Sequence, residues 1–191
     1  MKAWRCFFLA LALAGAQLVT PGALAAEPIR VGVSASLTGT YAAPGSDLLD
    51  GLKMWAYDVN SRGALLGRRV EIVSYDDQSD PDTSARLYEK LISNDQVDLL
   101  IGPYASDVTL AASEVAERHG FPMVSPSASA TGIWSRGYQN VFQVDSPADR
   151  YMDLLIESAS NAGLTTIALA YAGNDFPREV ARGVRTKAAT A

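Results

Sequence analysis

Cysteine, histidine and an excess of basic charge are what this sequence lacks. Its 191 residues contain one cysteine, Cys6, which excludes an internal disulfide framework and a cysteine-based zinc site. The single histidine, His119, precedes Gly120 at an expected helix end, where we interpret it as a surface residue that meets the terminal carbonyls. The formal charge of −5 and a sequence pI of about 4.8 argue against a nucleic-acid partner, because phosphate binding needs a basic face.

Long hydrophobic runs are also missing, and the one apolar run near the start predicts a secretory signal peptide over residues 1–25. Lys2 and Arg5 form a positive start, residues 6–16 are apolar, and a small-residue cleavage motif ends at Ala25. The run is shorter than the ~18 residues of a membrane-spanning helix. The mature chain would have no cysteine and 14 basic against 21 acidic residues. We therefore expect it in the periplasm.

Beyond the signal, short apolar segments alternate with longer amphipathic ones, the pattern of βαβ units in a doubly wound parallel α/β sheet. The expected strands are residues 29–35, 69–75, 97–101, 122–125, 141–144 and 166–171. The expected helices are residues 46–62, one beginning at Asp80-Pro81, one from a cap at Ser106 or Asp107 to His119, one from Ser146 to near Gly163, and one beginning around Pro177. No glycine, proline or strand follows the last helix, which favours a truncated chain.

We find no catalytic nucleophile, base or metal-binding cluster in this sequence. The nucleophile-elbow, P-loop and zinc-protease motifs are absent, and the glycines after the first strand do not fit dinucleotide spacing. The carboxylates between Asp76 and Asp82 suit a strand end and a helix N-terminus better than a cation site. We therefore expect neither an enzyme nor a bound metal or cofactor.

Two turns are better suited to holding a small charged ligand. Residues 102–106 (GPYAS) and 125–129 (SPSAS) each follow an expected strand and carry hydroxyls and free backbone N–H groups. Read alone, Ser106 is as easily the cap of its own helix, and residues 125–129 an ordinary polar loop. In a parallel sheet, however, both turns project from the carboxyl edge, so we expect them to converge.

At these turns the sequence resembles the periplasmic substrate-binding proteins of branched-chain amino-acid ABC transporters. The resemblance covers Ile29 to about Ala189. It rests on Leu37-Thr38-Gly39 with Gly45, Asn60-Ser61-Arg62-Gly63, Gly67-Arg68-Arg69, residues 75–81 (YDDQSDP), the turn at 102–106, Ser125-Pro126 and Arg136-Gly137-Tyr138.

The resemblance implies two α/β lobes of the type I periplasmic binding fold that close on a ligand. Residues 26–145 would form lobe one without its returning segment, and residues 146–191 the start of lobe two. In such proteins the position of Ser106 binds the α-carboxylate, the positions of Ser127 and Ser129 bind carboxylate and ammonium through backbone and hydroxyl, and the position of Phe176 covers the ligand. The candidate ligand-binding residues are Ser106, Ser127, Ser129, Ala128, Tyr104, Ala105, Tyr41, Pro44 and Phe176.

The expected function is the periplasmic capture of an amino acid of branched-chain type, or a related small carboxylate, for a membrane permease. The alternative ligand is an aromatic or short organic acid, with a pocket lined by Tyr41, Tyr104, Trp134 and Phe176. A ligand-sensing ectodomain is the other alternative. We expect a monomer that binds no nucleic acid.

Overall fold

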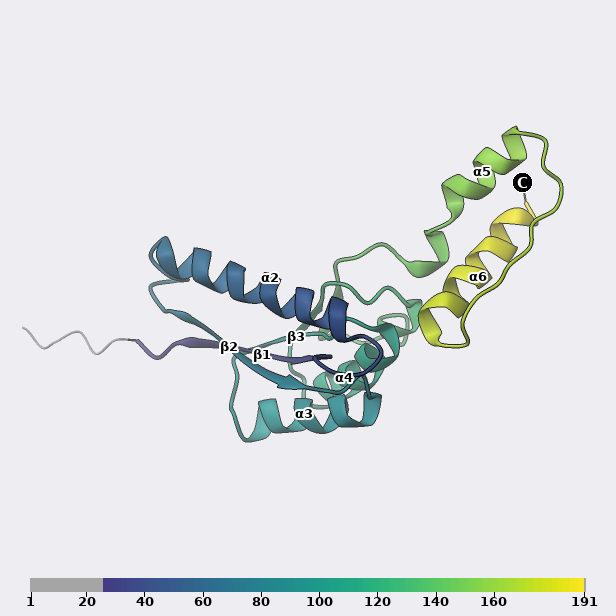
Figure 1. The fold of residues 1–191 in the computed structure, drawn as a ribbon. Coiled ribbons are helices and arrows are strands. Elements are labelled where there is room, and N and C mark those ends of the chain that lie inside the picture. The colour runs from purple at the N-terminus through teal and green to yellow at the C-terminus, as the bar shows by residue number, and fades with distance from the viewer. Residues whose placement is uncertain (1–25, 191) are drawn as a thin grey trace, which may run out of the picture.

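The computed structural model describes residues 26–190, and its body is a five-stranded, all-parallel sheet (Figure 1). The strands are β1 (Ile29–Ala35), β2 (Val70–Asp76), β3 (Leu99–Ile101), β4 (Met123–Ser125) and β5 (Val141–Gln143), in the order β2-β1-β3-β4-β5. Each end lies within two residues of the sequence-based prediction. Since all five strands run the same way, the loops after them share one edge of the sheet.

Helices cover both faces of this sheet, which confirms the predicted doubly wound α/β class. Helix α2 (Ala42–Ser61) lies on one face, and α3 (Pro81–Ser93) and α4 (Ser106–Arg118) on the other (Figure 1). The main core lies under α3 and α4, where the largest fully buried side chains include Tyr88, Leu91, Leu100 and Met123.

The helix starts show which cap predictions were right. Asp80 caps α3 by accepting the N–H of Thr83 at 2.7 Å, as predicted. The expectation that Ser106 or Asp107 caps α4 is wrong, because Ala105 holds the cap position and makes no side-chain cap bond. The Ser106 hydroxyl is thereby left for the candidate site.

After β5 the chain leaves the sheet and forms an arm (Figure 1). It contains η2 (Ala148–Arg150), α5 (Asp153–Asn161) and α6 (Asp175–Ala188), while a short helix η1 (Thr131–Ile133) lies in the body. The predicted helix from Ser146 to Gly163 is therefore split. The break at Tyr151 and Met152 lets the Tyr151 hydroxyl reach Asp145 at 2.7 Å.

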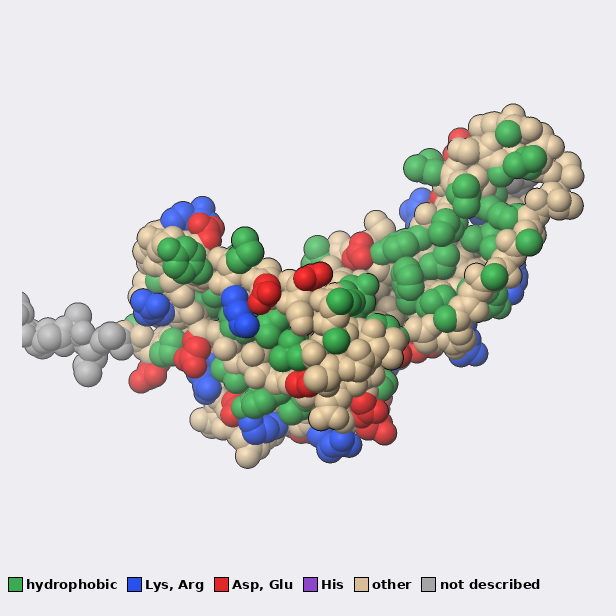
Figure 2. Space-filling model, viewed as in Figure 1, with side chains coloured by type: hydrophobic (Ala, Val, Ile, Leu, Met, Phe, Trp, Pro, Cys, Tyr) green, Lys and Arg blue, Asp and Glu red, His purple; other side chains and the backbone are tan. Residues whose placement is uncertain are grey.

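The predicted strand at residues 166–171 does not form. Its sequence is apolar, but a strand needs a neighbour for its backbone hydrogen bonds, and none of the described residues supplies one. Ile167, Leu169 and Tyr171 are each 37–45% exposed. Leu154 and Leu155 of α5 are also exposed. Figure 2 shows apolar side chains, in green, over the surface of the arm.

Within the arm α6 crosses η2, and α6 also bonds to the body. Gly183 lies so close to Asp149 that a methyl group placed on it would be 1.8 Å from the Asp149 carbonyl oxygen. Arg182 donates to the Asp149 carboxylate at 3.0 Å, and Thr131 donates to Glu179 at 2.9 Å. These contacts hold the N-terminal end of α6 near the carboxyl edge of the sheet.

Within residues 26–190, no helix is long and apolar enough to span a membrane. The predicted signal peptide, residues 1–25, lies outside the described residues.

Candidate functional site

A cleft of about 500 Å³ lies between the carboxyl edge of the sheet and the start of α6. Its walls combine two carboxylates, several hydroxyls and four aromatic rings. It is lined by Tyr41, Pro44, Tyr104, Ala105, Ser106, Asp107, Ser127, Ser129, Asp145, Tyr151, Ala172, Asn174, Phe176 and Pro177. Eight of the nine predicted site residues are in this list, and Ala128 is not.

The two predicted turns do converge. The Ser106 Oγ accepts the backbone N–H of Ser129 and that of Ala130, both at 3.2 Å. Gly102 permits this approach, since an added Cβ would lie 3.3 Å from the Ser125 Cα. No group in residues 26–190 accepts the Ser106 hydroxyl proton, and Ser106 is 4% exposed. The serine can therefore donate a hydrogen bond to a ligand in the cleft.

Asp145 lies beside this turn, just after β5. Its Oδ2 accepts the hydroxyls of Tyr151 at 2.7 Å and Ser129 at 2.9 Å, and its Oδ1 accepts the N–H of Ser146 at 2.7 Å. Partial burial alone would raise the pKa of Asp145, but these three hydrogen bonds outweigh it and hold the pKa below its ordinary value. The carboxylate is thus charged at neutral pH.

A second hydrogen-bonded group joins the arm to the body across the cleft. The Asn174 Nδ2 donates to the Tyr41 hydroxyl at 2.9 Å, and that hydroxyl donates to the Asp107 Oδ2 at 3.3 Å. Burial raises the pKa of Tyr41, and the negative charge of Asp107 raises it further by a smaller amount. The phenol therefore keeps its proton and remains a donor to Asp107.

The rings in the cleft pack in two pairs. The ring centroids of Tyr41 and Tyr104 are 6.2 Å apart, and those of Tyr151 and Phe176 are 5.3 Å apart in an edge-on arrangement. Phe176 reaches the cleft from α6. Trp134, which the aromatic-acid hypothesis placed in the pocket, instead packs against the main core and does not line the cleft.

Ala128 has a structural place behind the cleft wall. It is 1% exposed, and its carbonyl accepts hydrogen bonds from Gln143 and Ser125. The serine turn is therefore held from behind, while Ser127 and Ser129 line the cleft.

Four polar or aromatic lining residues were not predicted: Asp107, Asp145, Tyr151 and Asn174. Asp145 could have been predicted from the sequence. It follows β5 as Ser106 follows β3, and loops that follow parallel strands lie at the same edge of the sheet. Tyr151 and Asn174 belong to the arm, whose path across the edge of the sheet no local pattern gives.

The acidic residues between Asp76 and Asp82 have structural roles. Asp76 accepts the N–H groups of Leu37 and Thr38, and buried Asp77 accepts the hydroxyls of Ser34 and Ser36. The structure places no metal-binding cluster of His, Cys, Asp or Glu within its described residues.

The sequence suggested that His119 meets the carbonyls at the helix end, but its side chain bonds to another helix instead. Its Nε2 lies 2.7 Å from the Glu89 Oε2 of the neighbouring helix α3. The prediction that His119 lies at a helix end is confirmed, but the predicted partner, the terminal carbonyls, is wrong.

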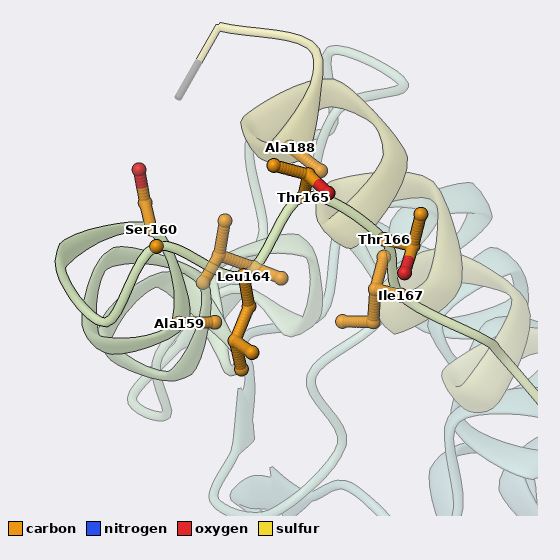
Figure 3. A pocket seen from close by; sticks show the side chains of 9 residues that line it. Ala159, Ser160, Leu164, Thr165, Thr166, Ile167 and Ala188 are labelled. Carbon is orange, nitrogen blue, oxygen red and sulfur yellow. The ribbon is translucent and has the colours of Figure 1, made fainter.

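Another hollow lies on the arm, between the end of α5, residues 164–167 and the end of α6 (Figure 3). Ala159, Leu164, Ile167 and Ala188 contribute to its walls, and no titratable side chain from the described part of the chain lines it. It offers little to a charged ligand, so we take the cleft as the candidate site.

Comparison with known proteins fits this arrangement. A family model described as periplasmic binding protein matches residues 28–191. The chain belongs to the periplasmic binding protein family. Its members are binding proteins, which agrees with the expectation that the chain is not an enzyme.

Two curated relatives are amino-acid-binding proteins by name. The Leu/Ile/Val-binding protein of Escherichia coli K12 is 33% identical over 62% of this chain and 32% of its own length. The leucine-, isoleucine-, valine-, threonine-, and alanine-binding protein of Pseudomonas aeruginosa is 33% identical over 71% of this chain and 35% of its own length. The chain thus spans about a third of these relatives.

Solved structures of solute-binding proteins share the fold. The substrate-binding protein LivJ of Streptococcus pneumoniae, in complex with isoleucine, has a TM-score of 0.72 at 22% identity and covers 84% of this chain and 46% of its own. A solute-binding protein from R. palustris, in complex with benzoate, has a TM-score of 0.73 at 27% identity and covers 85% and 45%. These structures confirm the predicted type I periplasmic binding fold.

Proposed function

We propose that this chain is the ligand-binding part of the solute-binding component of an ABC importer, and that its cleft binds an amino acid. The observation that carries this is the place of Ser129 between Ser106 and Asp145. Its backbone N–H bonds to the Ser106 Oγ, and its hydroxyl bonds to the Asp145 carboxylate. A donor for a carboxylate and an acceptor for an ammonium therefore bond to the same residue and line the same cleft, where one α-amino acid could use both.

The surroundings of this pair suit a small ligand. The cleft volume of about 500 Å³ is within the range of small-molecule sites, about 300–1,000 Å³. Ala105 and the start of α4 add backbone N–H groups beside Ser106, where the helix dipole favours a carboxylate. Tyr104 and Phe176 supply apolar surface for the rest of the ligand.

An aromatic acid is the second candidate, favoured by the benzoate complex of the R. palustris relative and by the four rings in the cleft. Charge argues against it. Among the described residues, the lining contains Asp107 and Asp145 but no lysine, arginine or histidine. A benzoate would bring a third negative charge without a cation to match it.

The wider setting follows from the same proposal. We infer that residues 1–25 direct export to the periplasm, that residues 26–145 belong to lobe one and residues 146–191 to lobe two, and that the protein acts as a monomer. An ABC permease would be the partner that receives the ligand. Intact mass and size-exclusion measurements on protein isolated from the periplasm test cleavage after Ala25 and the monomeric state.

Isothermal titration calorimetry tests the ligand proposal. The secreted chain is titrated with L-leucine, L-valine, L-lysine and benzoate. Ser106→Ala is the test variant, and Ser135→Ala, an exposed serine on the body, is the control. A hydrogen bond to a charged group contributes about 1.5–3 kcal/mol, so Ser106→Ala should weaken amino-acid binding about 10- to 100-fold. Binding of benzoate alone, or equal affinities of the two variants, would refute the proposal.

A further inference from the structure

The charges that line the cleft do not balance for a simple amino acid. Two carboxylates, Asp107 and Asp145, face a space that no lysine, arginine or histidine of residues 26–190 lines. Neither carboxylate forms an ion pair within residues 26–190. A ligand held as proposed brings one ammonium for Asp145 and one carboxylate for Ser106. Asp107 is then left without a cation.

The contacts of Asp107 are all with neutral donors. Its Oδ2 accepts the Tyr41 hydroxyl at 3.3 Å, and its Oδ1 accepts the Val108 N–H at 3.1 Å. The first turn of α4 also favours a negative charge through the helix dipole. These contacts keep the carboxylate in place, but they leave its charge unpaired in the cleft wall.

Asn174 holds Tyr41 from the other side of its hydroxyl. Its Nδ2 donates to the Tyr41 hydroxyl at 2.9 Å, so the phenolic proton stays directed at Asp107. The Asn174 Oδ1 is buried and closed to the cleft. The Asp107 carboxylate, which lines the cleft, is therefore the acceptor that a ligand can reach.

We propose that the ligand is an amino acid whose side chain ends in a cationic nitrogen, which the Asp107 carboxylate binds. This deepens the proposed function and rests on it. The α-carboxylate and α-ammonium meet Ser106 and Asp145, and the second cation meets Asp107. A branched-chain amino acid would leave Asp107 without a cation.

A pair of ligands of nearly equal shape tests the inference. L-lysine and L-norleucine have the same straight side chain, and lysine adds the terminal ammonium. We expect the wild-type chain to bind L-lysine about tenfold or more tightly than L-norleucine in calorimetry, as a charge-assisted contact implies. Asp107→Asn should remove most of this preference while leaving L-norleucine binding nearly unchanged.

Asp82→Asn is the matched control. Asp82 is the second residue of α3, as Asp107 is the second residue of α4, but it is exposed and remote from the cleft lining. It should change neither affinity. Equal binding of the two ligands, or an equal loss of both in Asp107→Asn, overturns the inference and leaves the proposed function standing. Failure of every amino acid to bind overturns both.

Discussion

One substitution, glycine to alanine, is predicted to have opposite effects in two helices of this protein. Gly51 lies in α2, and a Cβ there would meet no atom within 4 Å. Alanine is favoured over glycine in a helix interior by about 1 kcal/mol, so Gly51→Ala should raise the free energy of unfolding by about that amount. Gly183 lies in α6, where the new Cβ would be 1.8 Å from the Asp149 carbonyl oxygen and 2.5 Å from its carbon.

At Gly183 both contacting atoms are backbone, so a change of rotamer does not relieve the clash. The crossing of α6 over η2 has to open, which also separates Arg182 from Asp149. Overpacking of this kind costs about 1–3 kcal/mol, and the helix propensity of alanine offsets about 1 kcal/mol of it. We therefore expect the docking of α6 to be weakened by up to about 2 kcal/mol.

Hydrogen–deuterium exchange read by mass spectrometry, together with urea unfolding, measures both effects. Gly183→Ala should speed amide exchange in α6 and η2 while β1 and β3 stay protected, because docking opens without unfolding of the sheet. Gly51→Ala should raise the urea midpoint. If Gly183→Ala stabilises the protein as Gly51→Ala does, the close crossing of α6 and η2 is wrong.

Three further predictions concern the body and the cleft. Ser106→Ala should lower the free energy of unfolding by about 2 kcal/mol, because two buried N–H groups lose their acceptor. A free energy of unfolding in urea that lies within about 0.5 kcal/mol of the wild-type value would contradict this. Asp77→Ala should lower the same free energy by about 3 kcal/mol or more, since three neutral donors lose a charged acceptor, whereas exposed Asp82→Ala should have little effect. The folded pKa of Asp145 is depressed, so its contribution to stability is present above pH about 4 and is lost as the pH falls through the folded value. Asp145→Asn should flatten the acid limb of the pH–stability curve, and an unchanged limb would contradict the assignment.

Most of the body was predictable because its signals are local. The strand from Ile29 to Ala35 is a short apolar segment, and Asp80-Pro81 is a sequence-level helix start. Once the sheet is parallel, the edge rule alone brings Ser106 and Ser129 together. Half of the candidate site was therefore within reach of the sequence.

The other half depends on contacts between distant segments. The cap prediction for Ser106 failed because its hydroxyl bonds to residues more than twenty positions away, which no helix rule includes. The strand predicted at 166–171 failed because apolar character gives a segment no hydrogen-bonding neighbour. The hydrogen bond from Asn174 to Tyr41 joins residues 133 positions apart, which no local sequence pattern predicts.

The central claim, that the cleft binds an amino acid through Ser106 and Asp145, is tested most directly by a ¹⁵N-resolved NMR titration of the secreted chain with L-lysine. We predict that the largest shifts of the backbone amides occur at Ser106, Ser129 and Ala130 and next to Asp145, and that they saturate together. Shifts confined to α5, residues 164–171 and the end of α6, or no shifts at high L-lysine concentration, would contradict the claim.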